Sequence, residues 1–169
     1  MVATIKFAKV RPDAIIPSKR AEDMGFDLYP CFDEDFIMIG EHETVLIPTG
    51  IASCCDPGYG FLLRERGSTG SKGIALRCGV IDSGYRSEWF VGLTNTTNGV
   101  VYISKFKNQE ELRQHYPSMP RGLIYPYTKA IAQALVVPVP GTIVKEITYE
   151  ELQQIPSERG IGKLGSSNK

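Results

Sequence analysis

The sequence lacks an excess of either charge, since 19 lysine and arginine residues balance 19 aspartate and glutamate residues. A protein held to nucleic acid or to a membrane surface by charge needs a basic surplus, so neither partner is expected. No apolar run is long enough to cross a bilayer. The N-terminus alternates like a strand and has no signal-peptide core. We therefore expect a soluble protein of the cytoplasm.

Histidine and paired cysteine are also scarce, which argues against a zinc site. The two histidines are His42 and His115, and the four cysteines, Cys31, Cys54, Cys55 and Cys78, form no Cys-x-x-Cys pair. In a reducing compartment these cysteines are expected to be buried or half-buried thiols. Nothing in the pattern indicates a catalytic cysteine.

What the sequence does contain is a series of short, alternating strands in a chain of about one domain's length. Turn signals such as Asp56-Pro57-Gly58 separate them. This spacing predicts an all-β sandwich, jelly roll or barrel. The expected strands are 3–9, 25–29, 35–39, 43–47, 60–64, 88–94, 100–104 and 129–139. Helices are expected at 108–116 and at 148–154, where Thr148 and Glu151 form a capping-box pattern.

The segment from Cys78 to Glu88 is the one around which we expect the chain to be organised. Val80 and Ile81 lead into Asp82-Ser83-Gly84, and an alternating run follows, which predicts a strand, a tight turn and a second strand. Such a stiff hairpin with glycines and one carboxylate suits a nucleotide site. The alternative is a surface hairpin in which the aspartate caps a turn.

Three other segments have phosphate-binding or metal-binding composition. Residues 64–73 form a basic, glycine-rich turn after a strand, and residues 159–169 combine an arginine, glycines and two serines in a tail. Asp27 lies between apolar strand residues, where either a metal's water shell or a neighbouring arginine would explain a carboxylate. The tail contains Gly-x-Gly-x-x-Gly, but too few residues follow it for a dinucleotide-binding unit.

Taken in order, these segments resemble the five motifs of the trimeric dUTP pyrophosphatase (dUTPase) family. The five are Met24–Tyr29, Arg66–Gly73, Gly79–Arg86, Ile131–Gln133 and Arg159–Ser167. The resemblance covers nearly the whole chain, and its third and fifth motifs are the specific ones. Residues 96–127, between the third and fourth motifs, read as a solvated excursion. They resemble an insertion of some bacteriophage members, which would place the protein in a host's cytoplasm.

The resemblance implies a jelly-roll-like β-barrel subunit in a homotrimer, with sites between subunits. It implies a β domain over residues 1–155 and a flexible tail over 156–169 that closes on phosphate and base. The reaction would convert dUTP and water into dUMP and pyrophosphate, with Mg²⁺ on the triphosphate. The purpose would be to keep uracil out of DNA and to supply dUMP.

Residue roles also follow from the resemblance. Asp82 would accept a proton from the attacking water, and Asp27 would hold Mg²⁺ through water. Tyr85 would lie against the deoxyribose, while the backbone of Gly79, Val80 and Ile81 would meet the uracil and exclude a 5-methyl group. The expected contacts to phosphate, and from the tail to the base, are Arg66, Gly67, Ser68, Gln133, Arg159, Leu164, Gly165, Ser166 and Ser167.

Three motifs depart from the family's usual pattern. Arg66-Gly67-Ser68 replaces Arg-Ser-Gly, so either Gly67 or Ser68 would meet the phosphate. Thr128-Lys129-Ala130 replaces Gly-Asp-Arg at the start of the fourth motif. Leu164 stands in place of the phenylalanine that stacks on the base.

Two other functions are compatible with such a scaffold. A dCTP deaminase would need a carboxylate on the strand after the third motif, but Gly92 occupies that place. A regulatory or protein-interaction module would use the excursion at 96–127 as its docking surface.

Overall fold

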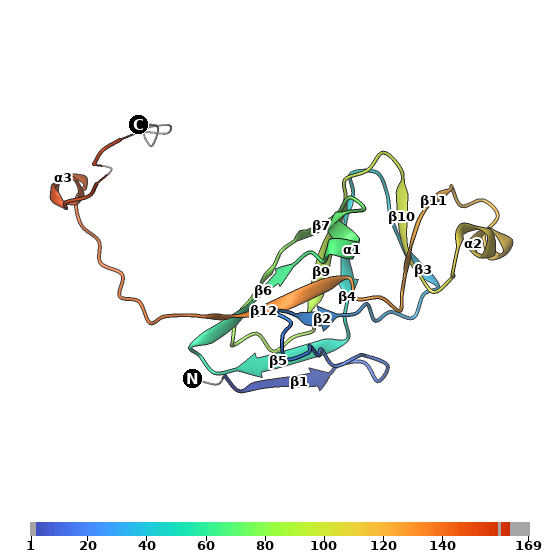
Figure 1. The fold of residues 1–169 in the computed structure, drawn as a ribbon, viewed down its shortest axis with the longest axis horizontal. Helices are drawn as coiled ribbons and strands as arrows, with labels where there is room; N and C mark the ends of the chain where they lie inside the picture. Colours follow the sequence, from blue (N-terminus) through green and yellow to red (C-terminus); the bar gives the residue numbers. More distant parts are fainter. Residues whose placement is uncertain (1–2, 159, 163–169) are drawn as a thin grey trace. The chain divides into compact units, whose positions relative to one another are not determined.

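A computed structural model describes residues 3–158 and 160–162 of the chain. The chain separates into two compact units, residues 1–139 and residues 140–169, and each is described by itself. The first unit is built mainly of short strands, which confirms the predicted all-β class (Figure 1). The described residues of the second unit contain one short helix, α3 (Tyr149–Gln154), which begins with the predicted capping box between Thr148 and Glu151.

The strands of the first unit form four small sheets. One sheet pairs β1 (Ile5–Lys9) with β5 (Ile51–Cys55), and another has the order β11 (Gly122–Pro126), β10 (Val100–Ser104), β3 (Phe36–Ile39). The third has the order β2 (Phe26–Leu28), β12 (Ala132–Pro138), β6 (Tyr59–Arg64), β8 (Val80–Ile81). The fourth has the order β4 (Thr44–Pro48), β9 (Phe90–Asn95), β7 (Ile74–Arg77).

The core of the first unit is aromatic and aliphatic, and it lies between these sheets. Trp89 is fully buried, and its ring centroid lies 4.9 Å from that of Phe61 and 5.8 Å from that of Phe7. These edge-to-face contacts join three segments that are far apart in the sequence. They add about 1 kcal/mol per pair to the burial itself. Because Trp89 is anchored in the core, the positions of the segments just before and just after it are fixed as well.

The sequence predicted that the strands on either side of Asp82 pair with each other as a hairpin, and this prediction is wrong. β8 pairs with β6, whereas β9 pairs with β4 and β7, so the two strands belong to different sheets. The residues between them form an arch. Its far end is fixed by the buried side chain of Trp89 and by the hydrogen bond from the Trp89 amide to the Ile51 carbonyl, at 2.8 Å. Tertiary packing therefore overrides the local hairpin signal.

The excursion over residues 96–127 is not merely solvated. It contains β10, the helix α2 (Gln109–His115), which Asn108 caps, and β11, which pairs in parallel with β10 (Figure 1). Leu112 and Tyr125 are fully buried, so the segment contributes to the packed interior. The strands β5, β7 and β11 were absent from the sequence-based prediction.

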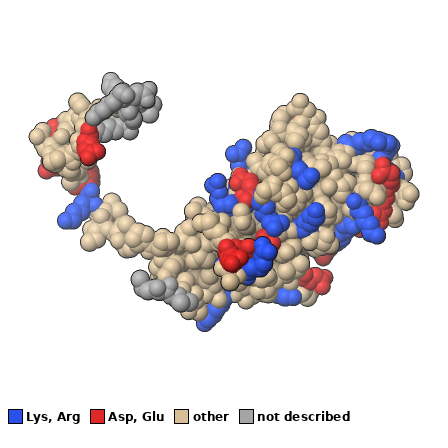
Figure 2. All heavy atoms as spheres, viewed as in Figure 1, with Lys and Arg blue, Asp and Glu red and all other residues tan. Residues whose placement is uncertain are grey.

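The visible face of the first unit carries both acidic and basic side chains (Figure 2). Across the described residues, no helix has the length and hydropathy that crossing a membrane requires.

Candidate functional site

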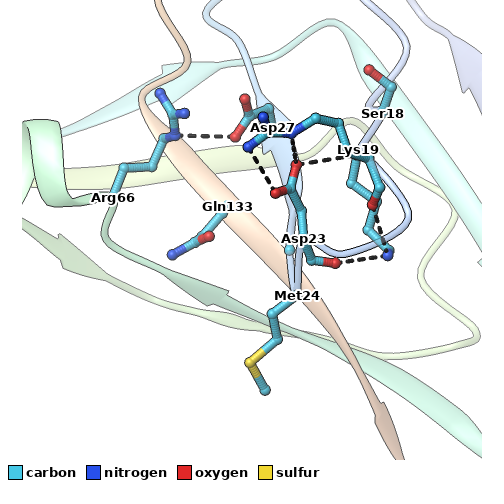
Figure 3. Close-up of a pocket in the computed structure, with 9 residues that line it drawn as sticks. Ser18, Lys19, Asp23, Met24, Asp27, Arg66 and Gln133 are labelled. Atoms are coloured by element: carbon cyan, nitrogen blue, oxygen red, sulfur yellow. Dashed lines mark hydrogen bonds and ion pairs between the residues drawn. The ribbon is translucent and has the colours of Figure 1, made fainter.

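A polar cavity of about 490 Å³ lies among the motif residues. Segments from the first, second and fourth motifs meet there, together with the loop that precedes β2 (Figure 3). We call it the cationic cavity, because three basic side chains line it against two carboxylates. Its lining residues are Ser18, Lys19, Arg20, Asp23, Met24, Gly25, Asp27, Arg66 and Gln133.

Strand pairing places Asp27 and Gln133 side by side in this cavity. β2 and β12 are antiparallel neighbours, and Asp27 is the register partner of Gln133. The Gln133 side chain donates from Nε2 to the Glu65 carbonyl at 2.9 Å, which fixes its amide. Gly25 makes room for it, since a Cβ at that position would lie 2.9 Å from Gln133 Oε1.

Arg66 reaches the same cavity from the end of β6, where it precedes the short helix α1 (Gly67–Gly70). Its Nε lies 3.0 Å from Asp27 Oδ1, and both side chains are 32% exposed. The sequence suggested that either a metal's water shell or a neighbouring arginine would explain a carboxylate at position 27. The structure contains the neighbouring arginine. An ion pair this exposed adds about 0–1 kcal/mol to stability, so the pair is better suited to placing charge than to holding the fold together.

The loop before β2 brings a second ion pair and a lysine. Arg20 Nε and Nη2 both donate to the Asp23 carboxylate at 3.0 Å, and these bonds lower the pKa of Asp23. Lys19 Nζ donates to the backbone carbonyls of Asp23, at 2.7 Å, and Arg20, at 3.3 Å (Figure 3).

The remaining second-motif residues lie beside this cavity but do not line it. The Ser68 hydroxyl is hydrogen-bonded to the Tyr125 hydroxyl at 3.1 Å, and Tyr125 in turn donates to the Ala130 carbonyl at 2.7 Å. Gly67 is exposed in the first turn of α1. The Ser68 hydroxyl is thus already engaged in this structure, whereas the Gly67 backbone faces solvent.

Asp82 lies in a separate cavity of about 300 Å³, which we call the Asp82 cavity. Apolar and aromatic side chains dominate it, and its lining residues are Leu46, Cys78, Val80, Ile81, Asp82, Tyr85 and Phe90. The carboxylate of Asp82 is exposed and makes no hydrogen bond or ion pair with any residue in the described part of the chain. A turn fixes its backbone, because the Tyr85 amide donates to the Asp82 carbonyl at 3.1 Å.

The approach to Asp82 is constrained by backbone contacts. The Gly79 carbonyl accepts from the Leu63 amide at 2.6 Å, and a Cβ at Gly79 would lie 2.8 Å from the Leu63 carbonyl oxygen. Gly79 is therefore required for close packing against β6. Cys78 precedes it with a φ of 55°, a left-handed conformation that is unusual for a residue with a side chain.

The structure thus gathers the predicted residues into two groups that share no lining residue. Asp27, Arg66 and Gln133 meet in one cavity, and Val80, Ile81, Asp82 and Tyr85 meet in the other. The predicted tail contacts lie outside the described residues; they are Arg159, Leu164, Gly165, Ser166 and Ser167. Sequence reasoning missed Lys19, Arg20, Asp23 and Cys78, although the first three stand just before the first motif.

Comparison with known proteins identifies the family. The sequence profile described as dUTPase matches residues 11–108. The deoxyuridine 5'-triphosphate nucleotidohydrolase of Nautilia profundicola is 32% identical, over 98% of this chain and 99% of that protein. The chain belongs to the dUTPase family. A second relative with the same name, from Janthinobacterium sp. strain Marseille, is 32% identical and aligns over 88% of this chain and 85% of its own length.

Solved dUTPase structures share the fold. The Staphylococcus bacteriophage 80alpha dUTPase with dUPNHPP superposes with a TM-score of 0.73 at 22% identity, over 98% of this chain and 99% of that one. The dUTPase from phage phi11 of S. aureus, described with a species-specific insert, superposes with a TM-score of 0.64 at 17% identity, over 85% of this chain and 96% of that one. The expected dUTPase fold is thereby confirmed.

Gly92, the position that a deaminase would need, has little room for a side chain in this dUTPase family member. It lies on β9 between β4 and β7, and a Cβ there would be 3.0 Å from the Arg77 carbonyl oxygen. A carboxylate at this position would require β7 to shift, which agrees with its absence from the sequence.

Proposed function

We propose that this protein hydrolyses dUTP to dUMP and pyrophosphate. One observation carries the proposal: the exposed Asp82 carboxylate lines the same small cavity as Tyr85 and the apolar pair Val80-Ile81. In a member of the dUTPase family, this places a proton acceptor beside a surface suited to a base and a sugar. The 32% identical relatives bear the name of the same activity.

In the proposed reaction Asp82 removes a proton from a water molecule. The water oxygen forms a bond to the α-phosphorus, and the bond from that phosphorus to the bridging oxygen of the β-phosphate breaks. Pyrophosphate leaves with that electron pair. Asp82 is exposed, so a water molecule can approach its side chain, as a general base requires.

Selectivity for the nucleoside would come from the shape of the Asp82 cavity. Tyr85 is held over the arch by its hydroxyl, which donates to the Glu88 carbonyl at 3.1 Å. A fixed ring at this place would leave no room for a ribose 2'-hydroxyl, and the backbone at Gly79 to Ile81 would contact the uracil edge. Steric exclusion of this kind discriminates by roughly 10-fold to 200-fold per group.

The triphosphate would be held by the cationic cavity and by the tail. Of the phosphate contacts expected from the sequence, Arg66 and Gln133 line this cavity, and the Gly67 and Ser68 segment lies beside them. Arg159, Ser166 and Ser167 would add donors, while Leu164 and Gly165 would close over the base. Charge that develops on the phosphate oxygens is offset by donors already in place.

Mg²⁺ is the metal that this chemistry implies, and the donor set fits a metal carried largely by the substrate. The described residues contain no cluster of three acidic, histidine or cysteine side chains. Asp27 is the acidic first-motif residue in the cationic cavity, and we propose that it holds Mg²⁺ through water. When bound, Mg²⁺ would neutralise phosphate charge. A phage phi11 relative is described with a structural Mg(II) ion.

A homotrimer would bring the two cavities into one site. The proposal is supported by the separation of the predicted residues into two groups within one chain, which leaves Asp82 without the phosphate-binding residues. A site built from more than one subunit resolves this, and the tail of residues 156–169 would complete it. We place the enzyme in the cytoplasm, because its highly charged substrate does not cross membranes unaided.

The test is pyrophosphate release from dUTP in the presence of Mg²⁺, with dTTP, dCTP and UTP assayed beside it and the mass of the assembly measured in the same buffer. Release from dUTP alone by a trimer is expected. Ammonia release from dCTP, or no release from any nucleotide, would reject the proposal.

A docking role for residues 96–127 is a second candidate. A hollow on α2 and the following loop, lined by Gln109, Arg113 and Arg121 among others, would be the contact surface. Deletion is a poor test, because Leu112 is buried and the Tyr102 hydroxyl donates to the Pro120 carbonyl at 2.9 Å. The double substitution Arg113→Glu and Arg121→Glu changes two exposed side chains and should abolish partner capture without changing turnover.

A further inference from the structure

The charges of the cationic cavity do not cancel. Its basic side chains are Lys19, Arg20 and Arg66, and its acidic ones are Asp23 and Asp27. Arg66 is paired with Asp27, and Arg20 is paired with Asp23. Within the described residues, Lys19 is the cation of this cavity that has no carboxylate partner, and Figure 3 shows its ammonium group beside the loop.

Lys19 is nonetheless held in place. Its ammonium group donates to the two backbone carbonyls of Asp23 and Arg20, and it lies 5.7 Å from the ring centroid of Phe26. These acceptors are neutral, so no carboxylate is in direct contact with the ammonium group within the described residues. Replacing one of these neutral carbonyl acceptors by an anionic oxygen would add a direct attraction between opposite charges to the hydrogen bond.

Among the described residues of the fourth motif, the uncharged Gln133 lines the cationic cavity, whereas Lys129 does not. Ala130 is 2% exposed, and its carbonyl is the acceptor for Tyr125 and, at 3.5 Å, for Arg66 Nη1. The positive charge of this part of the site therefore comes from Arg66 and from the loop that carries Lys19.

We propose that Lys19 is a phosphate ligand of the active site that binds the pyrophosphate portion of the substrate. This inference rests on the proposed dUTP hydrolysis and deepens it. The Asp82 cavity, with its apolar lining, suits the nucleoside end. The separate cationic cavity suits the phosphates that are farthest from the base. Lys19 therefore acts on binding of the leaving group and has no role in activating water.

The test measures binding without turnover, so it does not depend on hydrolysis. Affinity for inorganic pyrophosphate and for dUMP is measured by titration calorimetry, with and without Mg²⁺. The variants are Lys19→Gln, which keeps hydrogen-bond donors but no charge, and Lys19→Arg, which keeps the charge. The matched control is Lys9→Gln, since Lys9 is also exposed and donates to a backbone carbonyl, that of Pro12, at 3.2 Å.

Lys19→Gln should weaken pyrophosphate binding about tenfold and leave dUMP binding unchanged. Lys19→Arg should retain most of the affinity, and Lys9→Gln should match the wild type. Equal pyrophosphate affinity in Lys19→Gln and Lys9→Gln, or no pyrophosphate binding by the wild-type protein, would overturn the proposal. A wild-type protein that binds pyrophosphate through Lys19 but hydrolyses no dUTP would refute the proposed function alone.

Discussion

Arg66 Nε lies 3.0 Å from Asp27 Oδ1, and this ion pair connects the second motif to the first across the central strand β12. The two residues are 39 positions apart in the sequence, and they are brought together because β2 and β6 flank β12 on opposite sides. The pair sets the position of the guanidinium that we propose binds phosphate.

Replacing Arg66 by glutamine should reduce kcat/KM for dUTP by about tenfold or more, because a charged donor to phosphate is lost. The melting temperature should hardly change, since a partly exposed ion pair contributes little to stability. The control is Arg64→Gln, which removes a neighbouring arginine whose ion pair with Glu65 spans 4.0 Å outside the cavity. An equal loss of activity in both variants would contradict a specific role for Arg66.

Asp82→Asn should lower kcat by about a hundredfold or more while leaving the affinity for a non-hydrolysable dUTP analogue nearly unchanged. The amide keeps the size of the side chain but cannot accept the proton. Because Asp82 is exposed, the fold should be unaffected. Asp33→Asn, at a fully exposed carboxylate, is the control. Substantial residual turnover would mean that another group is the base.

Tyr85→Ala should raise kcat/KM for UTP relative to dUTP by about tenfold, because the ring that excludes the 2'-hydroxyl is removed. Tyr85→Phe keeps the ring and loses the hydrogen bond to Glu88, so it should preserve most of the discrimination. Steady-state kinetics with both nucleotides provides the comparison. If UTP remains excluded in the alanine variant, the sugar is recognised elsewhere.

Cys78 should be the first cysteine to react with a thiol reagent. It is exposed in the Asp82 cavity, whereas burial raises the pKa of the Cys31 and Cys55 thiols and so disfavours their reactive thiolate forms. Alkylation of Cys78 should therefore inactivate the enzyme, and bound dUMP should slow this alkylation. Peptide mass mapping identifies the modified residue, and a Cys78→Ala variant should resist inactivation.

Asn95→Ala should destabilise the protein by about 2–3 kcal/mol. The Asn95 amide is fully buried and donates to the carbonyls of Ile39, Gly40 and Gly99, which would lose their partner. Thermal unfolding measures the effect, with the exposed Asn98→Ala as the control. A loss below about 0.5 kcal/mol would show that water replaces the amide.

The local signals in the sequence determined the elements that depend on neighbouring residues. Alternation predicted most of the strands, and Asn108 and the Thr148–Glu151 pattern marked the starts of the helices α2 and α3. The order of the five motifs indicated the dUTPase family, because each motif is a short contiguous segment.

Tertiary structure decided which of these segments meet. The pairing of β8 with β6 instead of β9 follows from the burial of Trp89, a packing effect that no local pattern encodes. Strand order placed Asp27 beside Gln133 and Arg66, yet left Asp82 in a cavity of its own. The role inferred for Lys19 likewise arises only in the fold, because its lack of a carboxylate partner depends on the two ion pairs that neutralise its neighbours.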